Sequence, residues 1–134
     1  MKGEIVTSAG HGVFRVWARA WETDDGLVLG LFGGDRTHVG TVVLSVPRPS
    51  LSDPAQISST SSVLNLVGHK EEELLRPLAE EAARRLKRPV VAVCGIHVDG
   101  ATREQIMELS TLARQAWNEV IEQIINNSFS RQES

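Results

Sequence analysis

The chain has 134 residues, of which 41% are hydrophobic and 23% charged, with a formal net charge of -3 at pH 7. These values indicate a single soluble domain over residues 1–134 and exclude the basic surface by which nucleic-acid-binding domains are recognised. A lone cysteine, Cys94, excludes an internal disulfide and a cysteine zinc site, and the absence of a membrane-length apolar run or a signal-peptide segment favours a cytoplasmic protein with no membrane contact.

The first half of the chain is typical of β-strands. Alternating apolar and polar residues predict a strand over residues 13–21, and Asp24-Asp25-Gly26 predicts a turn after it. A second strand over 27–32 and a third over 39–46 complete an antiparallel meander. Residues 4–7 either extend this sheet or lead into it.

The connection between the second and third strands is unusually polar. It reads Gly33-Gly34-Asp35-Arg36-Thr37-His38-Val39-Gly40 and is called segment 33–40 below. A hairpin tip needs only two turn-forming residues, whereas this segment supplies an acceptor, a fixed cation, a hydroxyl and a titratable ring in succession. We therefore interpret segment 33–40 as a binding surface whose glycines let backbone N–H groups approach an anion.

The middle of the chain changes from polar to regular structure. Residues 47–62 are rich in Pro and Ser and predict a long polar loop. A strand at 63–67 precedes a helix over about 70–86, and the continuous apolar run at 90–96 is typical of a strand buried on both faces. This order predicts a β-α-β unit with a parallel strand pair.

A long helix ends the chain. It begins at a capping box of Thr102 and Gln105 and keeps its apolar spacing to Asn127, after which residues 128–134 are expected to fray. Its apolar stripe, which contains Trp117, is explained by packing on the sheet. The predicted class is α+β, with an antiparallel β-meander followed by a β-α-β-α unit and two helices packed on one mixed sheet.

Three histidines lie at the ends of predicted elements. His38 opens a strand, whereas His69 and His97 each follow a strand and precede a helix. Ligand sites in open sheets lie beyond the carboxyl ends of parallel strands, so we expect these histidines to be neighbours. Three histidines suffice for zinc, but no short His or Cys pair is present and the spacing disfavours a metal. The structural alternative is that each ring only bonds nearby backbone.

The same region suits a phosphate. Arg36 offers a planar fork for bidentate binding, and Lys70 at a helix start adds a point charge. The alternative for Asp35 and Arg36 is a solvated surface ion pair, since the chain has no standard nucleotide-binding motif. The predicted cofactor-binding site has no catalytic residue or metal ligand and comprises Gly33, Gly34, Asp35, Arg36, Thr37, His38, His69, Lys70, His97 and Asp99. Cys94 is expected in the core.

Taken in order, segment 33–40, Gly68-His69-Lys70-Glu71 and Gly95-Ile96-His97-Val98-Asp99 resemble the small D subunit of bacterial gallate and hydroxybenzoate decarboxylase systems, a prenylated-flavin chaperone domain. The resemblance spans about Val13 to Leu109. It implies a non-catalytic accessory protein that handles prenylated FMN or FMN for a UbiD-type decarboxylase of aromatic acids. The domain is also similar in architecture to small proteasome-assembly chaperones, which pair as dimers.

Two other functions remain open from the residues. One is a metal-assisted enzyme that uses His38, His69 and His97. The other is a structural assembly partner with no small ligand. A homodimer fits any of these functions, and Trp17, Trp21 or Trp117 would lie in its interface, because aromatic residues are enriched there.

Overall fold

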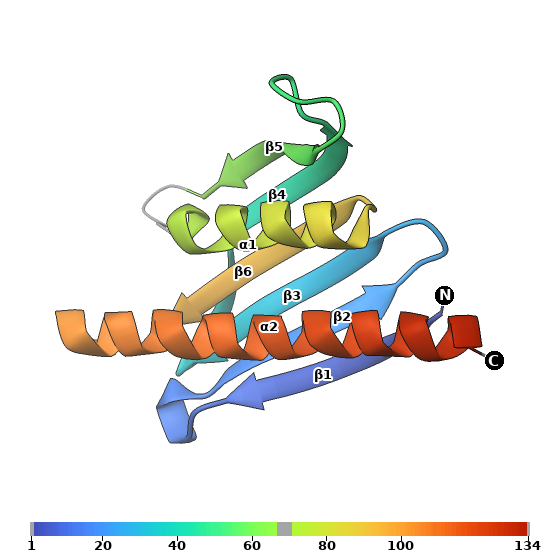
Figure 1. Cartoon of the computed structure of the whole chain (residues 1–134). Coiled ribbons are helices and arrows are strands. Elements are labelled where there is room, and N and C mark those ends of the chain that lie inside the picture. Colours follow the sequence, from blue (N-terminus) through green and yellow to red (C-terminus); the bar gives the residue numbers. More distant parts are fainter. Residues whose placement is uncertain (1, 67–70, 134) are drawn as a thin grey trace.

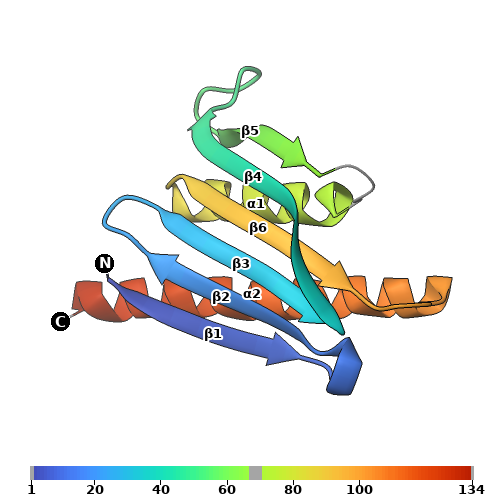
Figure 2. The same cartoon turned by 180° about the vertical axis from the view of Figure 1, so that it is seen from behind.

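The computed structural model describes residues 2–66 and 71–133. In these residues six strands form one sheet in the order β1-β2-β3-β6-β4-β5, and two α-helices pack on one of its faces (Figures 1 and 2). The predicted α+β class with two helices on a mixed sheet is confirmed. The elements are β1 (Gly3–Ala9), the 3-10 turn η1 (Gly12–Phe14), β2 (Val16–Glu22), β3 (Leu27–Gly34), β4 (Arg36–Pro49), β5 (Ile57–Asn65), α1 (Glu72–Leu86), β6 (Val90–His97) and α2 (Arg103–Glu133).

Strand β6 lies in the interior of the sheet. It pairs parallel with β3 and antiparallel with β4. Strands β1, β2 and β3 form an antiparallel meander, so residues 4–7 do extend the sheet. The strand before α1 is antiparallel to β4 and does not touch β6. The predicted parallel pair between the strand at 63–67 and the strand at 90–96 is therefore wrong, since the parallel partner of β6 is β3. The strand expected at 39–46 does not join the meander either, because β6 lies between β3 and β4. Both β3 and β6 are apolar enough to occupy the interior of the sheet.

The polar stretch 47–62 is not a long loop, and this prediction is corrected. Strand β4 continues to Pro49 and β5 begins at Ile57, which leaves only residues 50–56 as the connection. Hydroxyl groups satisfy one another across the two strands, since Ser61 Oγ donates to Ser45 Oγ at 3.1 Å. Ser59 is buried and its Oγ donates to the carbonyl oxygen of Glu80 in α1 at 3.4 Å, whereas Thr60, Ser62 and Asn65 of this edge strand are exposed.

The two helices divide the inner face of the sheet. Helix α1 packs on β4, β5 and β6, whereas α2 crosses β1 and β2 (Figure 1). Trp117 and Cys94 are fully buried in this core, which places Trp117 against the sheet rather than at a dimer interface. None of the helices in the described part of the chain has the length and apolar character needed to cross a membrane.

The two ends of α2 test the predicted capping box and the predicted frayed tail. The capping box is confirmed, because the Gln105 N–H donates to Thr102 Oγ1 at 3.2 Å and the Thr102 N–H donates to Gln105 Oε1 at 2.9 Å. The helix continues to Glu133, so the frayed tail expected over 128–134 is helical up to that residue.

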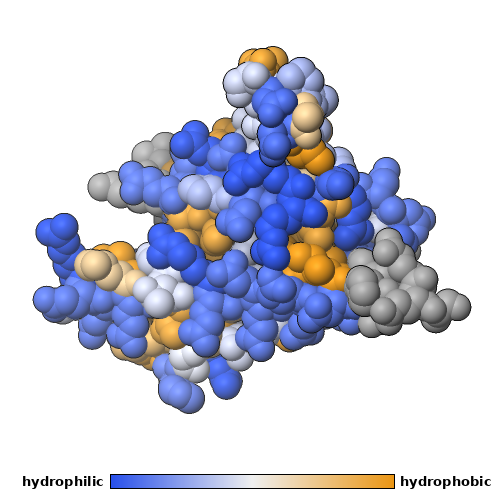
Figure 3. Space-filling view, viewed as in Figure 1, coloured by the Kyte–Doolittle hydropathy of each residue, from blue (hydrophilic) through white to orange (hydrophobic). Residues whose placement is uncertain are grey.

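The opposite face of the sheet is not covered by any described helix (Figure 2). Trp17, Val28 and Leu44 on this face are each 40–41% exposed. We call it the open sheet face. The helix side is mostly hydrophilic, with apolar side chains showing between α1 and α2 (Figure 3).

Candidate functional site

Segment 33–40 passes around the carboxyl end of β6 and does not form a hairpin tip. Gly34 in β3 and Arg36 in β4 pair with His97 from opposite sides. Between them, the Asp35 N–H donates to the carbonyl oxygen of His97 at 2.8 Å. The end of β6 is therefore enclosed by the segment that the sequence singled out.

Close packing explains the glycines of this region. A Cβ on Gly34, whose φ is +87°, would overlap the carbonyl group of His97, and a Cβ on Gly33 would lie 2.6 Å from the carbonyl oxygen of Arg15. The Gly34 N–H donates to that same Arg15 oxygen at 3.2 Å. Because the N–H groups of Gly34 and Asp35 bind backbone carbonyls, the interpretation of Gly34 as part of an anion cradle is wrong.

An irregularity in β4 directs His38 toward the helices. The register with β6 shifts between Thr37 and Thr41, and such bulges re-aim side chains. His38 Nε2 lies 3.1 Å from Glu71 Oε1, at the residue that precedes α1. Gly40 makes room for this carboxylate, because a Cβ there would lie 2.9 Å from Glu71 Oε2.

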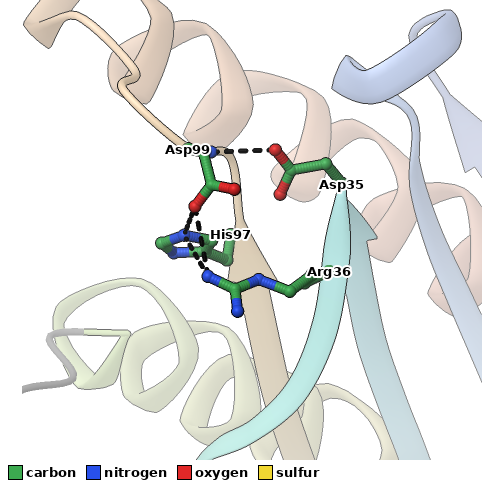
Figure 4. A network of polar contacts seen from close by, with 4 residues as sticks. All are labelled: Asp35, Arg36, His97 and Asp99. Atoms are coloured by element: carbon green, nitrogen blue, oxygen red, sulfur yellow. Dashed lines mark hydrogen bonds and ion pairs between the residues drawn. The ribbon is translucent and has the colours of Figure 1, made fainter.

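A second polar network lies at the end of β6 and contains Asp35, Arg36, His97 and Asp99 (Figure 4). His97 Nε2 is 2.7 Å from Asp99 Oδ1, and Arg36 Nη2 donates to the same oxygen at 3.1 Å. The Asp99 N–H in turn donates to Asp35 Oδ2 at 2.9 Å. The hydrogen bond with His97 and, second, the charge of Arg36 lower the pKa of Asp99 below its ordinary value of 3.8.

The two networks meet through their histidines. The ring centroids of His38 and His97 are 6.3 Å apart, with the ring planes inclined at 80°. The structure therefore brings together His38, His97, Arg36 and Asp99 as expected from the sequence. Thr37 is exposed in β4, where it pairs with Ile96 of β6. The predicted site residues His69 and Lys70 lie outside the described residues.

A pocket of about 530 Å³ opens between α1, α2 and the end of β6. This volume lies within the range of small-molecule sites, roughly 300–1,000 Å³. Its polar wall includes His38, Glu71 and His97, and its apolar wall includes Leu74, Ile96, Ile106 and Leu109. The pocket can therefore hold a small apolar group and offer hydrogen bonds from its polar wall.

Sequence reasoning missed Glu71 and the apolar wall. Glu71 belongs to a run of three glutamates that the dipole of α1 explains, and its place directly after Gly68-His69-Lys70 was the signal for a further role. Leu74 and Leu109 have the spacing of ordinary core residues. Nothing in one sequence separates a core residue from one that lines a pocket.

The same network offers a candidate metal cluster, whose chemistry is unfavourable. Ligand atoms of Asp35, His97 and Asp99 lie within 4.8 Å of one another. However, Arg36 Nη2 is 3.1 Å from Asp99 Oδ1 and 3.4 Å from His97 Nε2, so a fixed positive charge already occupies their common side. The arrangement suits an organic ligand better than a cation.

Comparison with known proteins covers almost the whole chain. Residues 10–125 match the family described as the prenylated flavin chaperone LpdD-like domain. A chain from a yeast complex described as a novel chaperone complex for 20S proteasome assembly aligns over 96% of this chain and 95% of its own, with a TM-score of 0.51 and 9% sequence identity. At this identity the likeness shows the fold alone. No curated protein sequence matches the chain.

Proposed function

The chain belongs to the LpdD-like prenylated flavin chaperone family, and from this premise we propose that it is a non-catalytic accessory protein that binds prenylated FMN and delivers it to a UbiD-type decarboxylase of aromatic acids. The observation that carries the proposal is the pocket between α1 and α2, which combines an apolar wall with two oriented histidines. A prenylated flavin has the matching chemistry, because its added ring is apolar and its pyrimidine edge is rich in hydrogen-bonding groups.

The pocket is also open enough to solvent for a bound ligand to be released. Its lip is formed in part by Ile106, which is 54% exposed near the start of α2. Apolar contact with Leu74 and Leu109 supplies affinity through burial, whereas the open lip leaves a path for release. A carrier needs both properties, since a fully enclosed cofactor would have to wait for the fold to open.

We further propose that two copies of the chain pair through the open sheet face. Trp17, Val28 and Leu44 are exposed there, although β3 and β6 have the two-sided apolar pattern of strands that are normally covered. Exposed apolar surface of this kind marks interaction sites. Charge does not oppose pairing at the β1–β2 end of the face, where Arg19 is neutralised by Glu4 at 3.2 Å.

Binding and delivery are tested in two steps. Purified protein is titrated with prenylated FMN and with FMN under anaerobic conditions, and flavin fluorescence is followed. Saturable binding at one ligand per chain is expected, and the loaded protein is expected to activate an apo-decarboxylase faster than an equal concentration of free cofactor. The absence of binding at millimolar ligand would overturn the proposal, and stoichiometric zinc, iron, nickel or manganese in untagged protein would favour the metal-assisted alternative.

A further inference from the structure

We propose that two copies of the chain pair about a twofold axis that runs along the strands, so that the β4–β5 edge of each copy fills a hollow over β1, β2 and β3 of the other. This inference rests on the proposed function, in which two copies pair through the open sheet face, and it adds the geometry of that pairing. It follows from the strand register, the shape of the face and its charge.

One row of residues crosses the whole open sheet face. Each is the Cα partner of the next across the sheet, and the row reads Val6, Arg19, Gly30, Val93, Val42 and Leu64. Val6 lies in the edge strand β1 and Leu64 in the edge strand β5. A twofold axis along the strands, midway between two stacked sheets, keeps the height of the row and exchanges its two ends. Leu64 of each copy then lies opposite Val6 of the other.

The row is hollowed at one end and raised at the other. A hollow of about 340 Å³ over β1, β2 and β3 is lined by Val6, Trp17, Arg19, Trp21 and Phe32. Gly30 has no side chain to fill it, and the Phe32 ring folds over this glycine, since a Cβ on Gly30 would lie 2.6 Å from Phe32 Cε2. At the other end of the row, Leu64 is 72% exposed. The face therefore offers both a hollow and a side chain that can enter it.

The shape of the face selects the axis along the strands. Stacked sheets keep their strands within about 30° of each other, so a twofold axis between them runs either along the strands or across them. An axis across the strands sets each strand over itself and leaves hollow facing hollow. The axis along the strands sets the raised end over the hollow and places Val93 opposite the gap at Gly30 of the other copy. Close packing of the buried surface favours this second arrangement.

The face is large and neutral enough for a stable dimer. Six strands about 4.8 Å apart and about seven residues long have a flat footprint of about 650 Å², and projecting side chains raise the accessible area toward the roughly 800 Å² per partner of a stable interface. Arg19 is the charged residue of the row, and Glu4 pairs with it at 3.2 Å. The Arg15 guanidinium lies 5.5 Å from the centre of the Trp17 ring, at the start of β2, where a polar rim is expected.

Pairing of this kind leaves both flavin pockets on the outside of the dimer. The two helices lie on the face of the sheet that points away from the other copy (Figures 1 and 2), and the pocket opens between these helices and the end of β6. Each copy is therefore expected to bind and release its ligand independently of the other.

Chemical crosslinking distinguishes the two axes. Val6→Cys and Leu64→Cys place thiols at opposite ends of the row, on positions 45% and 72% exposed, whereas the one native thiol, Cys94, is buried. A bismaleimide with a reach of about 15 Å spans two sheets packed about 10 Å apart, but not the roughly 24 Å between β1 and β5. A mixture of the two variants should convert up to about half of the chains to covalent dimers, because random pairing makes half of the dimers mixed. Either variant alone should yield almost none.

Leu51 supplies the matched control, because it is 91% exposed in the connection 50–56, beyond the end of β4. Leu51→Cys mixed with Val6→Cys should not crosslink. Leu64→Asp should weaken pairing about tenfold or more in light scattering, whereas Leu51→Asp should leave it unchanged. Efficient crosslinking of Val6→Cys with itself would show the axis across the strands and overturn the inference, while the pairing and flavin binding stand. A wild-type chain that is monomeric at every concentration would overturn the pairing itself, and failure of every flavin to bind would overturn the proposed carrier function.

Discussion

The imidazole rings of His38 and His97 lie 6.3 Å apart, centroid to centroid, and each Nε2 faces a different carboxylate. One ring leaves the bulge of β4 and the other ends β6. Glu71 orients the first and Asp99 the second, so both rings are held before a ligand arrives. A site arranged in advance loses less conformational freedom when it binds.

Asp99 is expected to titrate below the ordinary range of aspartate. The hydrogen bond from His97 is the larger cause and the charge of Arg36 the second, so His97→Ala should raise the pKa of Asp99 more than Arg36→Ala. A lowered folded pKa means that the contact stabilises the fold at neutral pH and is lost as the pH falls below about 4. Carbon NMR of the carboxyl groups measures these values, and the opposite order of the two variants would contradict the assignment.

Gly95 is expected to tolerate no side chain. A Cβ there would overlap the carbonyl group of His38, so Gly95→Ala should lower the free energy of unfolding by about 3 kcal/mol. Gly12→Ala is the control, because Gly12 has a φ of +58° but open space around it and should lose only about 1 kcal/mol. Urea unfolding measures both losses. Equal losses would mean that backbone conformation, and not contact with His38, decides the cost.

Cys94 is expected to be chemically inert in the folded protein. The thiol is fully buried and its pKa is raised to about 12, so almost no thiolate is present at pH 8. Labelling with a disulfide reagent should be slow in native buffer and complete within minutes in denaturant. Rapid native labelling would show that the core around β6 opens locally.

Two neighbouring residues of α2 should differ in their effect on flavin binding. Ile106 lines the pocket and is 54% exposed, whereas Met107 is 62% exposed and is not among the residues that line it. Replacing Ile106 with Ser removes apolar contact and should weaken binding about fivefold, or about 1 kcal/mol, with little loss of stability. Met107→Ser should leave the dissociation constant unchanged. Fluorescence titration distinguishes them, and similar losses for both would place the ligand outside the pocket.

The open sheet face is expected to carry the dimer contact. Leu44→Asp places a charge within this face and should shift the protein from dimer to monomer in light scattering across a concentration series. Met107→Asp, on the helix side, should leave the mass unchanged. A wild-type protein that is monomeric at every concentration would contradict the proposed pairing.

Local sequence patterns predicted individual helices and strands better than they predicted which strands pair in the sheet. The capping box of Thr102 and the existence of a strand at 90–96 were predicted correctly, since each depends on a few adjacent residues. The prediction that this strand is buried on both faces is wrong, because its residues alternate between buried and partly buried and the helices cover only one face of the sheet. The insertion of β6 between β3 and β4 could not be read, because pairing across the sheet is not written in any local period. The polar stretch at 47–62 was wrongly predicted to be a loop for a different reason. In an edge strand, serine and threonine hydroxyls can form hydrogen bonds with side chains of the neighbouring strand, so a polar sequence is compatible with a β-strand.

The candidate site was also predicted only in part. Arg36, His38, His97 and Asp99 meet because segment 33–40 encloses the end of β6. The histidine pattern predicted that His38 and His97 are neighbours, but not this enclosure. The apolar wall of the pocket could not be predicted, because its residues have the same helical spacing as residues that pack in the core. The contact between Glu71 and His38 could not be predicted either, because Glu71 belongs to a run of three glutamates that the helix dipole already explains.

The position of β6 also governs how the chain can fold. Among the strands of residues 2–66 and 71–133, β6 is synthesised last, yet it fills the gap between β3 and β4. Until residue 97 has left the ribosome, the growing chain carries two strand edges with unpaired N–H and C=O groups, which are prone to pair with other chains. The sheet can close only through contacts between residues far apart in the sequence, which slows folding. Any truncation before Val90 leaves both edges open permanently and should yield an aggregating polypeptide rather than a smaller domain.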